Sequence, residues 1–253
     1  MAVSQSPSKG SRLISRLLPV AIKFWLQTQL DEMGELTFEL QATDRQILSG
    51  QIPGIALAAQ GAIYRGVRLT DVTVHASDIE INIGQVLRGK SLQLKHAFPV
   101  AGNVMLAVDD LVASSTASVL AEGLLDFWQT LLAQADVAAE VTTHYGADVP
   151  ALKGPSLSQY QSKLDIVDAD LVLYLMALGQ QTMPTIRLRG GLGIDQGHRL
   201  QLTEARWCLP SGDQVCSDAL QDFCWDLGEQ TELRSLTIQN KQLTCQCKVM
   251  VHP

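Results

Sequence analysis

Apolar and polar residues alternate along much of residues 34–108, which is the pattern of half-buried β-strands. The clearest alternating positions are Leu36, Phe38, Leu40, Ile79, Ile81 and Ile83. Further strands are predicted at residues 55–64, 67–74, 92–94 and 100–108. Arg65-Gly66 predicts a tight turn, and the slip in phase at Thr70-Asp71 predicts a β-bulge. This block therefore reads as consecutive antiparallel strands.

Helical spacing replaces the alternation at Asp109-Asp110, where two acids suit the start of a helix. The predicted helix ends near Ala135 and has a broad apolar face. Residues 136–162 lack a period and are rich in Gly, Pro and Ser, so they read as a long connection.

The remaining residues return to strands, with one more helix. Strands are predicted at 163–167, 171–176, 186–189, 192–194, 200–207, 233–238 and 243–251. Hairpin turns are expected at 195–198 and at Asn240-Lys241, and a helix at 211–227 with Gly228 as its C-cap. Runs of strands separated by helices, rather than alternating βαβ units, indicate an α+β fold.

The first 30 residues differ in charge from the rest of the chain. They hold four bases and no acid, whereas the other residues hold 15 bases and 26 acids. On a helical wheel, Lys9, Arg12, Arg16 and Lys23 form one stripe opposite an aliphatic face that includes Trp25. This pattern fits a helix lying in a membrane interface. An ordinary helix packed on a sheet, or a targeting segment, remains an alternative.

The same segment is a poor candidate for a membrane span or a secretory signal, because Lys23 interrupts a short apolar run and no small-x-small site follows. We therefore expect a cytoplasmic protein that associates peripherally with a membrane. The expected organisation is an amphipathic helix at 1–33 and a single domain at 34–253.

Composition excludes two classes of protein. Of 253 residues, 46% are hydrophobic and 18% charged, which argues against intrinsic disorder. A net charge of −7 argues against a general nucleic-acid binder. Aromatic residues make up only 5%, so the core must be mainly aliphatic.

Candidate chemistry is sparse. The cysteines are Cys208, Cys216, Cys224, Cys245 and Cys247, an odd number that suits a reducing compartment. Cys245 and Cys247 should face one side of a strand; neutral thiols, a disulfide and a metal site are the alternatives. Asp165, Asp168 and Asp170 lack the other ligands of a calcium loop. The glycines from Gly190 to Gly193 lack the helix that a phosphate loop needs. We expect no enzyme activity, no cofactor and no metal.

Three stretches carry a resemblance to a known family: DRQILSGQIP at 44–53, AIYRGVRL at 62–69 and IEINIGQVLRG at 79–89. The pairs Phe24-Trp25 and Leu124-Leu125, followed by Asp126-Phe127, fit as well. Together they resemble the LmeA-like phospholipid-binding family, in its branch from photosynthetic bacteria. The resemblance implies a lipid-binding protein with long helices on a strongly curved antiparallel sheet, as in tubular lipid-binding domains.

These observations lead to a non-enzymatic phospholipid binder, possibly a carrier, at a membrane surface. The alternative is a structural or assembly factor that holds a protein partner on the same apolar surfaces. The predicted groove residues are Leu120, Leu124, Phe127, Trp128 and Leu131; a dry, close-packed core would use the same residues. The predicted membrane-surface residues are Arg12, Arg16, Lys23 and Trp25.

Overall fold

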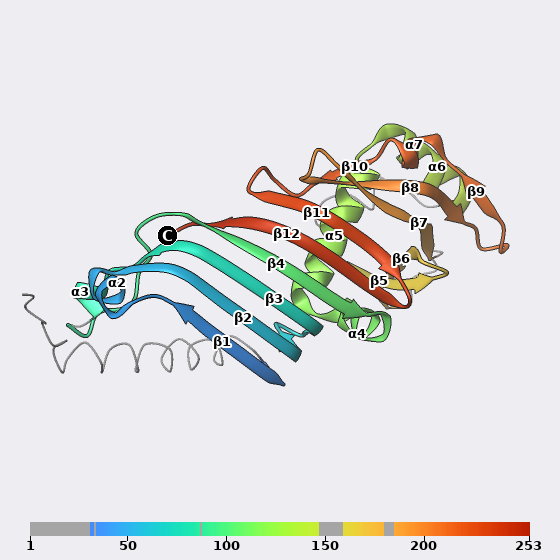
Figure 1. The fold of residues 1–253 in the computed structure, drawn as a ribbon. Coiled ribbons are helices and arrows are strands. Elements are labelled where there is room, and N and C mark those ends of the chain that lie inside the picture. Colours follow the sequence, from blue (N-terminus) through green and yellow to red (C-terminus); the bar gives the residue numbers. More distant parts are fainter. Residues whose placement is uncertain (1–30, 33, 87, 147–158, 180–184) are drawn as a thin grey trace, which may run out of the picture.

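The computed structural model describes residues 31–32, 34–86, 88–146, 159–179 and 185–253, which form two six-stranded sheets (Figure 1). The first sheet has the order β1-β2-β3-β4-β12-β11, and the second β10-β8-β7-β6-β5 with β9 beside β8. All strand pairs are antiparallel.

The first sheet comprises β1 (Glu35–Gln41), β2 (Gln51–Tyr64), β3 (Val67–Glu80), β4 (Phe98–Ala107), β11 (Thr231–Gln239) and β12 (Gln242–Val251). The second comprises β5 (Tyr160–Val167), β6 (Asp170–Ala177), β7 (Ile186–Asp195), β8 (Arg199–Cys208), β9 (Gln214–Cys216) and β10 (Cys224–Asp226). The helices are α2 (Asp44–Ser49), α3 (Ile83–Val86), α4 (Val108–Ala113), the 3-10 helix η1 (Ser114–Thr116), α5 (Ser118–Leu132), α6 (Ala135–Tyr145) and α7 (Asp218–Gln221).

Three hairpin turns predicted from the sequence are confirmed. The β2–β3 pair closes at Arg65-Gly66, and the β11–β12 pair at Asn240-Lys241. All four residues have positive φ, which matches the twist of a two-residue hairpin turn. The β7–β8 pair closes at residues 196–198. These turns depend on local backbone preferences, so the sequence alone could reveal them.

The main core lies between α5, α6 and the second sheet, where Trp128 and Trp207 have no exposed surface. Trp128 donates its indole N–H to Ser162 Oγ at 3.0 Å, and Trp207 donates to Glu140 Oε2 at 2.8 Å. Both buried indoles therefore have hydrogen-bond partners. Leu106 of the first sheet belongs to this core, which thus joins the two sheets.

The predicted α+β fold with long helices packed on the sheet is wrong. The structure is mostly β, and its longest described helix, α5, has 15 residues. The helix expected from Asp109 to Ala135 is interrupted by η1 and by Ala117, which is extended at φ −63° and ψ 138°. The Ser114 hydroxyl accepts a hydrogen bond from Arg68 N and donates to Asp110 O. Such side-chain bonds to the backbone compete with a continuous helix.

Three further expectations differ from the structure. The helix expected at 211–227 is instead β9, α7 and β10, because β8 pairs with both short strands and tertiary pairing overrides the local pattern. The long connection expected at 136–162 contains most of α6. At Thr70-Asp71 the β2–β3 register does not shift, since Asp71 pairs with Gln60 and Leu69 with Ala62.

No helix among the described residues is long and apolar enough to cross a bilayer. The predicted helix at 1–33, with Arg12, Arg16, Lys23 and Trp25, lies almost wholly outside the described residues. Its membrane role stays a prediction, as does the division of the chain at residue 33.

Candidate apolar binding face

The first sheet has one face on which nearly every side chain is apolar. Directly paired residues in an antiparallel sheet place their side chains on the same face. A row can therefore be followed across all six strands by register alone. The central row is Phe38, Leu57, Val74, Gly102, Cys247 and Leu233. Its neighbours are Leu36, Ala59, Val72, Val104, Cys245 and Leu236, and Leu40, Ile55, Ala76, Val100, Val249 and Thr231. We call these three rows the apolar face; they contain no charged residue.

The opposite face of the same strands is polar. Its central rows are Thr37, Ala58, Thr73, Asn103, Gln246 and Ser235, and Glu39, Ala56, His75, Ala101, Lys248 and Glu232. The sheet is thus amphipathic across its full width, and not only strand by strand.

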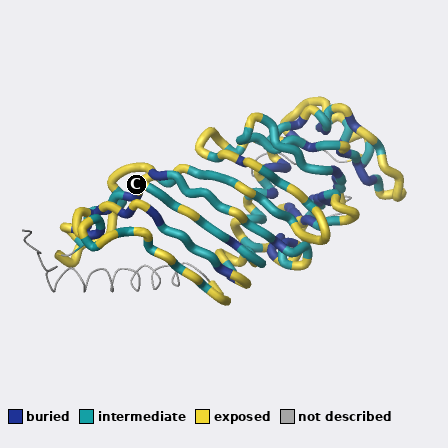
Figure 2. Tube along the Cα trace, viewed as in Figure 1, coloured by how far each residue is buried: buried dark blue, intermediate teal, exposed yellow. Residues whose placement is uncertain are grey.

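Helices pack against the apolar face at its two ends. At one end, Leu106, Val104 and Leu69 contact the core formed by α4, α5 and the second sheet. At the other end, a separate cluster around Ile47 and Ile83 joins α2 and α3 to the strands. Between these ends the side chains of Phe38, Leu57, Val74 and Cys247 are only half-buried. In Figure 2 this middle part of the sheet is mainly intermediate in burial, with dark blue segments at its ends.

The two thiols on the apolar face influence each other. Cys245 and Cys247 lie two residues apart on β12, on the same face, as the sequence indicated. The hydrogen bond from Cys245 lowers the pKa of Cys247 to about 7, although burial opposes the change. The same contact, together with burial, raises the pKa of Cys245. All five cysteines are unpaired in the structure.

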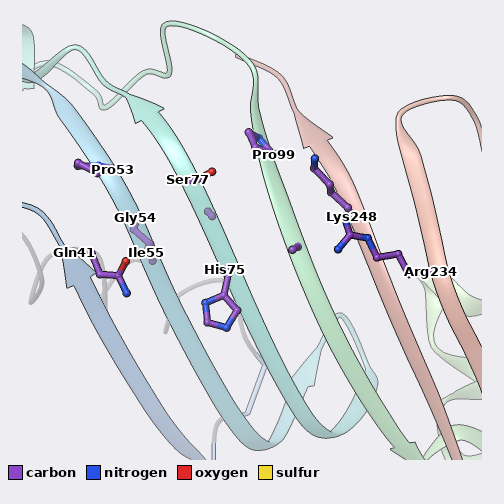
Figure 3. Close-up of a pocket in the computed structure, with 11 residues that line it drawn as sticks. Gln41, Pro53, Gly54, Ile55, His75, Ser77, Pro99, Arg234 and Lys248 are labelled. Carbon is purple, nitrogen blue, oxygen red and sulfur yellow. The ribbon is translucent and has the colours of Figure 1, made fainter.

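A hollow of about 350 Å³ lies on the polar face (Figure 3). Its floor includes the small residues Gly54 and Ala101, and Lys248 and Arg234 come from the neighbouring strands. Arg234 Nε donates to Glu232 Oε1 at 3.1 Å. This hollow is open and of mixed polarity, so it is less suited to an acyl chain than the apolar face.

The residues predicted to line a lipid groove lie on α5. Leu124, Phe127, Trp128 and Leu131 are buried in the main core, and Leu120 is partly buried against it. Phe127 makes edge-to-face contacts with Trp128 and Phe223, with ring centroids 6.0 and 5.2 Å apart. Protein side chains thus surround these residues in the structure, and their contact with a lipid stays a prediction.

The acidic residues considered as a cation site have other partners. Asp170 Oδ2 accepts from Arg189 Nε at 2.7 Å and from Arg206 at 2.6 Å, while exposed Asp168 reaches Arg189 at 3.4 Å. Among the described residues no group of three or more His, Cys, Asp or Glu side chains could hold a metal ion. The glycines Gly190, Gly191 and Gly193 lie within strand β7.

Sequence reasoning found the strands of the apolar face but did not identify the face as a site. The missing information was the register of β12 with β4, which joins residues 242–251 to residues 98–107. The sequence does contain a signal for this face, because apolar residues alternate with polar ones in all six strand segments. Leu57, Val74 and Cys247 are examples of these apolar positions.

Comparison with known proteins agrees with this lipid-compatible surface. No curated protein and no solved structure matches the chain. The model of one protein family matches residues 10–248. The description of that family names phospholipid binding and no reaction. The chain therefore belongs to the LmeA-like phospholipid-binding family.

Proposed function

We propose that this protein binds a phospholipid without altering it chemically, with the acyl chains lying on the apolar face of the first sheet. The observation that carries the proposal is the run of apolar positions across all six strands, whose central row is half-buried from Phe38 to Cys247 and buried only at Leu233. The proposal extends to a carrier that associates peripherally with a membrane on its cytoplasmic side. Five unpaired cysteines support a reducing compartment.

Acyl chains can bind such a face through the hydrophobic effect alone. Each methylene removed from water contributes about 0.8 kcal/mol, so a partly covered diacyl lipid gains enough to offset the cost of association. The uncharged rows impose no desolvation penalty of their own, because no ionised group must lose its water.

Two neighbouring residues on β3 provide a matched test. Val74 lies on the apolar face and Thr73 on the polar face, and both are half-buried. Val74→Gln should place an amide against the acyl chains and weaken phospholipid binding by about tenfold or more. Thr73→Gln should leave binding unchanged. Native mass spectrometry should show a phospholipid-sized adduct on the parent and on Thr73→Gln, and little on Val74→Gln.

A thermal unfolding midpoint for each variant separates lost binding from lost fold. If Val74→Gln does not fold, the parent protein still tests the proposal. Bound lipid should slow the alkylation of Cys247 and leave the alkylation rate of the exposed Cys216 unchanged. The proposal would be overturned if both variants fold and carry equal amounts of phospholipid adduct. It would also be overturned if lipid does not change the alkylation rate of Cys247.

A further inference from the structure

The end of the first sheet farthest from the second sheet combines positive charge with exposed leucines. It is formed by α2, α3 and the connection to β4, at the far left of Figure 1. Residues 81–97 include Arg88, Lys90 and Lys95 but no acid, and α2 adds Arg45 together with one acid, Asp44, so the region carries three net positive charges. This contrasts with a chain whose net charge is −7. We call α2 together with residues 81–86 and 88–97 the basic tip.

Two large hydrophobic side chains project from the basic tip. Leu48 is 41% exposed and Leu92 is 50% exposed, the latter the most exposed of the large hydrophobic residues described. Leu48 shares a hollow of about 440 Å³ with Arg88 and Lys95. Cationic and apolar side chains thus lie on one small surface, which is the combination found in segments that enter a membrane interface.

Local hydrogen bonds and a required glycine give the basic tip a defined shape. Gly50 ends α2 at φ 81°, and a Cβ there would lie only 2.4 Å from Ile81 O, so no other residue fits. Ile81 N donates to Gly50 O at 2.8 Å. Asn82 spans the following loop, since its amide donates to Ser91 O at 3.0 Å and its carbonyl accepts from Gln93 N at 2.8 Å.

The basic tip is continuous with the apolar face. The cluster beneath it contains Ile47 and Ile81, and its partly buried members include Leu40, Ile55 and Val100, which also belong to the apolar face. The nearby acid Glu80 lies 3.6 Å from His96, which offsets part of its charge when the imidazole is protonated. A lipid leaving a membrane at the tip would therefore meet apolar side chains from the first contact onward.

We infer that the basic tip docks on an anionic membrane surface, with Leu48 and Leu92 entering the interface and Arg45, Arg88, Lys90 and Lys95 facing lipid phosphates. Lipid would be exchanged at this end of the apolar face. This inference rests on the proposed function, but it concerns residues 44–49 and 88–97 and not the four bases in the first 30 residues.

Two sets of changes in the full chain test the inference, with the N-terminal segment unaltered. The tip set is Leu48→Ser, Leu92→Ser, Arg88→Gln, Lys90→Gln and Lys95→Gln. The control set makes equivalent changes at exposed positions elsewhere: Val119→Ser, Val167→Ser, Arg68→Gln, Lys163→Gln and Lys241→Gln. Both sets remove three charges and two apolar side chains.

Each protein is sedimented with vesicles of phosphatidylcholine and phosphatidylglycerol at low salt. The tip set should sediment at least about tenfold less than the parent, and the control set like the parent. Binding of monomeric dihexanoyl phosphatidylcholine from solution needs no membrane, so it should be equal in all three proteins. Equal sedimentation of the two sets would overturn the inference. Absence of short-chain lipid binding in the parent would instead count against the proposed function.

Discussion

Cys247 on β12 lies directly opposite Gly102 on β4, and a Cβ added to that glycine would lie 3.7 Å from the Cys247 sulfur. The missing side chain leaves one flank of the thiol uncovered at the centre of the apolar face. Cys245 donates a hydrogen bond to Cys247 and lowers its pKa to about 7. Cys247 is therefore open to reagents on one flank and also has a lowered pKa. A reactive thiol thus lies where the acyl chains are proposed to bind.

Cys247 should therefore be alkylated faster than the other cysteines at neutral pH. The thiolate is the reactive form, and a pKa lowered to about 7 makes it half-populated near that pH. Alkylation by iodoacetamide should rise as the pH increases through about 7. Cys245→Ala should move this rise to higher pH by removing the hydrogen bond. Peptide mapping by mass spectrometry identifies the thiol; an unchanged profile in Cys245→Ala would exclude the hydrogen bond as its cause.

Asp170→Asn should destabilise the fold more than Asp168→Asn; asparagine is used because Asp168 has a φ of 54°, which asparagine tolerates better than alanine. Asp170 is 23% exposed and binds two arginines, whereas Asp168 is 83% exposed. Losing the Asp170 carboxylate removes the acidic partner of the largely buried Arg206 and leaves Arg189 with only Asp168 and Val167 O as acceptors, at a cost of about 1–3 kcal/mol. Losing an exposed ion pair should cost less than about 0.5 kcal/mol. Urea unfolding of both variants measures the difference, and equal losses would contradict the assignment.

Leu124→Trp separates the packed core from the apolar face. Leu124 is 9% exposed and lies in the main core, so the larger ring should cost about 1–3 kcal/mol of unfolding free energy. Uptake of a fluorescent phospholipid by the remaining folded protein should be unchanged. Reduced uptake without loss of stability would instead support the groove on α5 and favour that location for the acyl chains.

Changing Arg12, Arg16 and Lys23 to Gln should weaken sedimentation with anionic vesicles at low salt. Three charges on the helical stripe predicted from the sequence each contribute on the order of 1 kcal/mol near such a surface, and salt screens them. Trp25→Asp is the companion variant: loss of folding would show that this segment packs on the protein, and retained folding with weaker sedimentation that it contacts the membrane. Equal sedimentation of the triple variant and the parent would contradict a membrane role for the stripe.

Turns and alternation could be predicted because they depend on neighbours in the sequence. Arg65-Gly66 and Asn240-Lys241 each meet the backbone demands of a tight hairpin within two residues. The alternation at Leu36, Phe38 and Leu40 identifies a strand with one apolar side before any partner is known. Family membership also came from the sequence, through the stretches at 44–53, 62–69 and 79–89.

Only the tertiary structure decided where the helices stop and which surfaces meet. The helix break at Ser114 depends on Arg68, 46 residues away, whose backbone N–H donates a hydrogen bond to the Ser114 hydroxyl. The apolar face depends on the pairing of Val104 with Cys245, since neither strand alone shows which strand will lie beside it. The sequence by itself determined which side chains are apolar and how they alternate; long-range strand pairing gathered them on one face, because such contacts are set by the whole sheet and not by neighbouring residues.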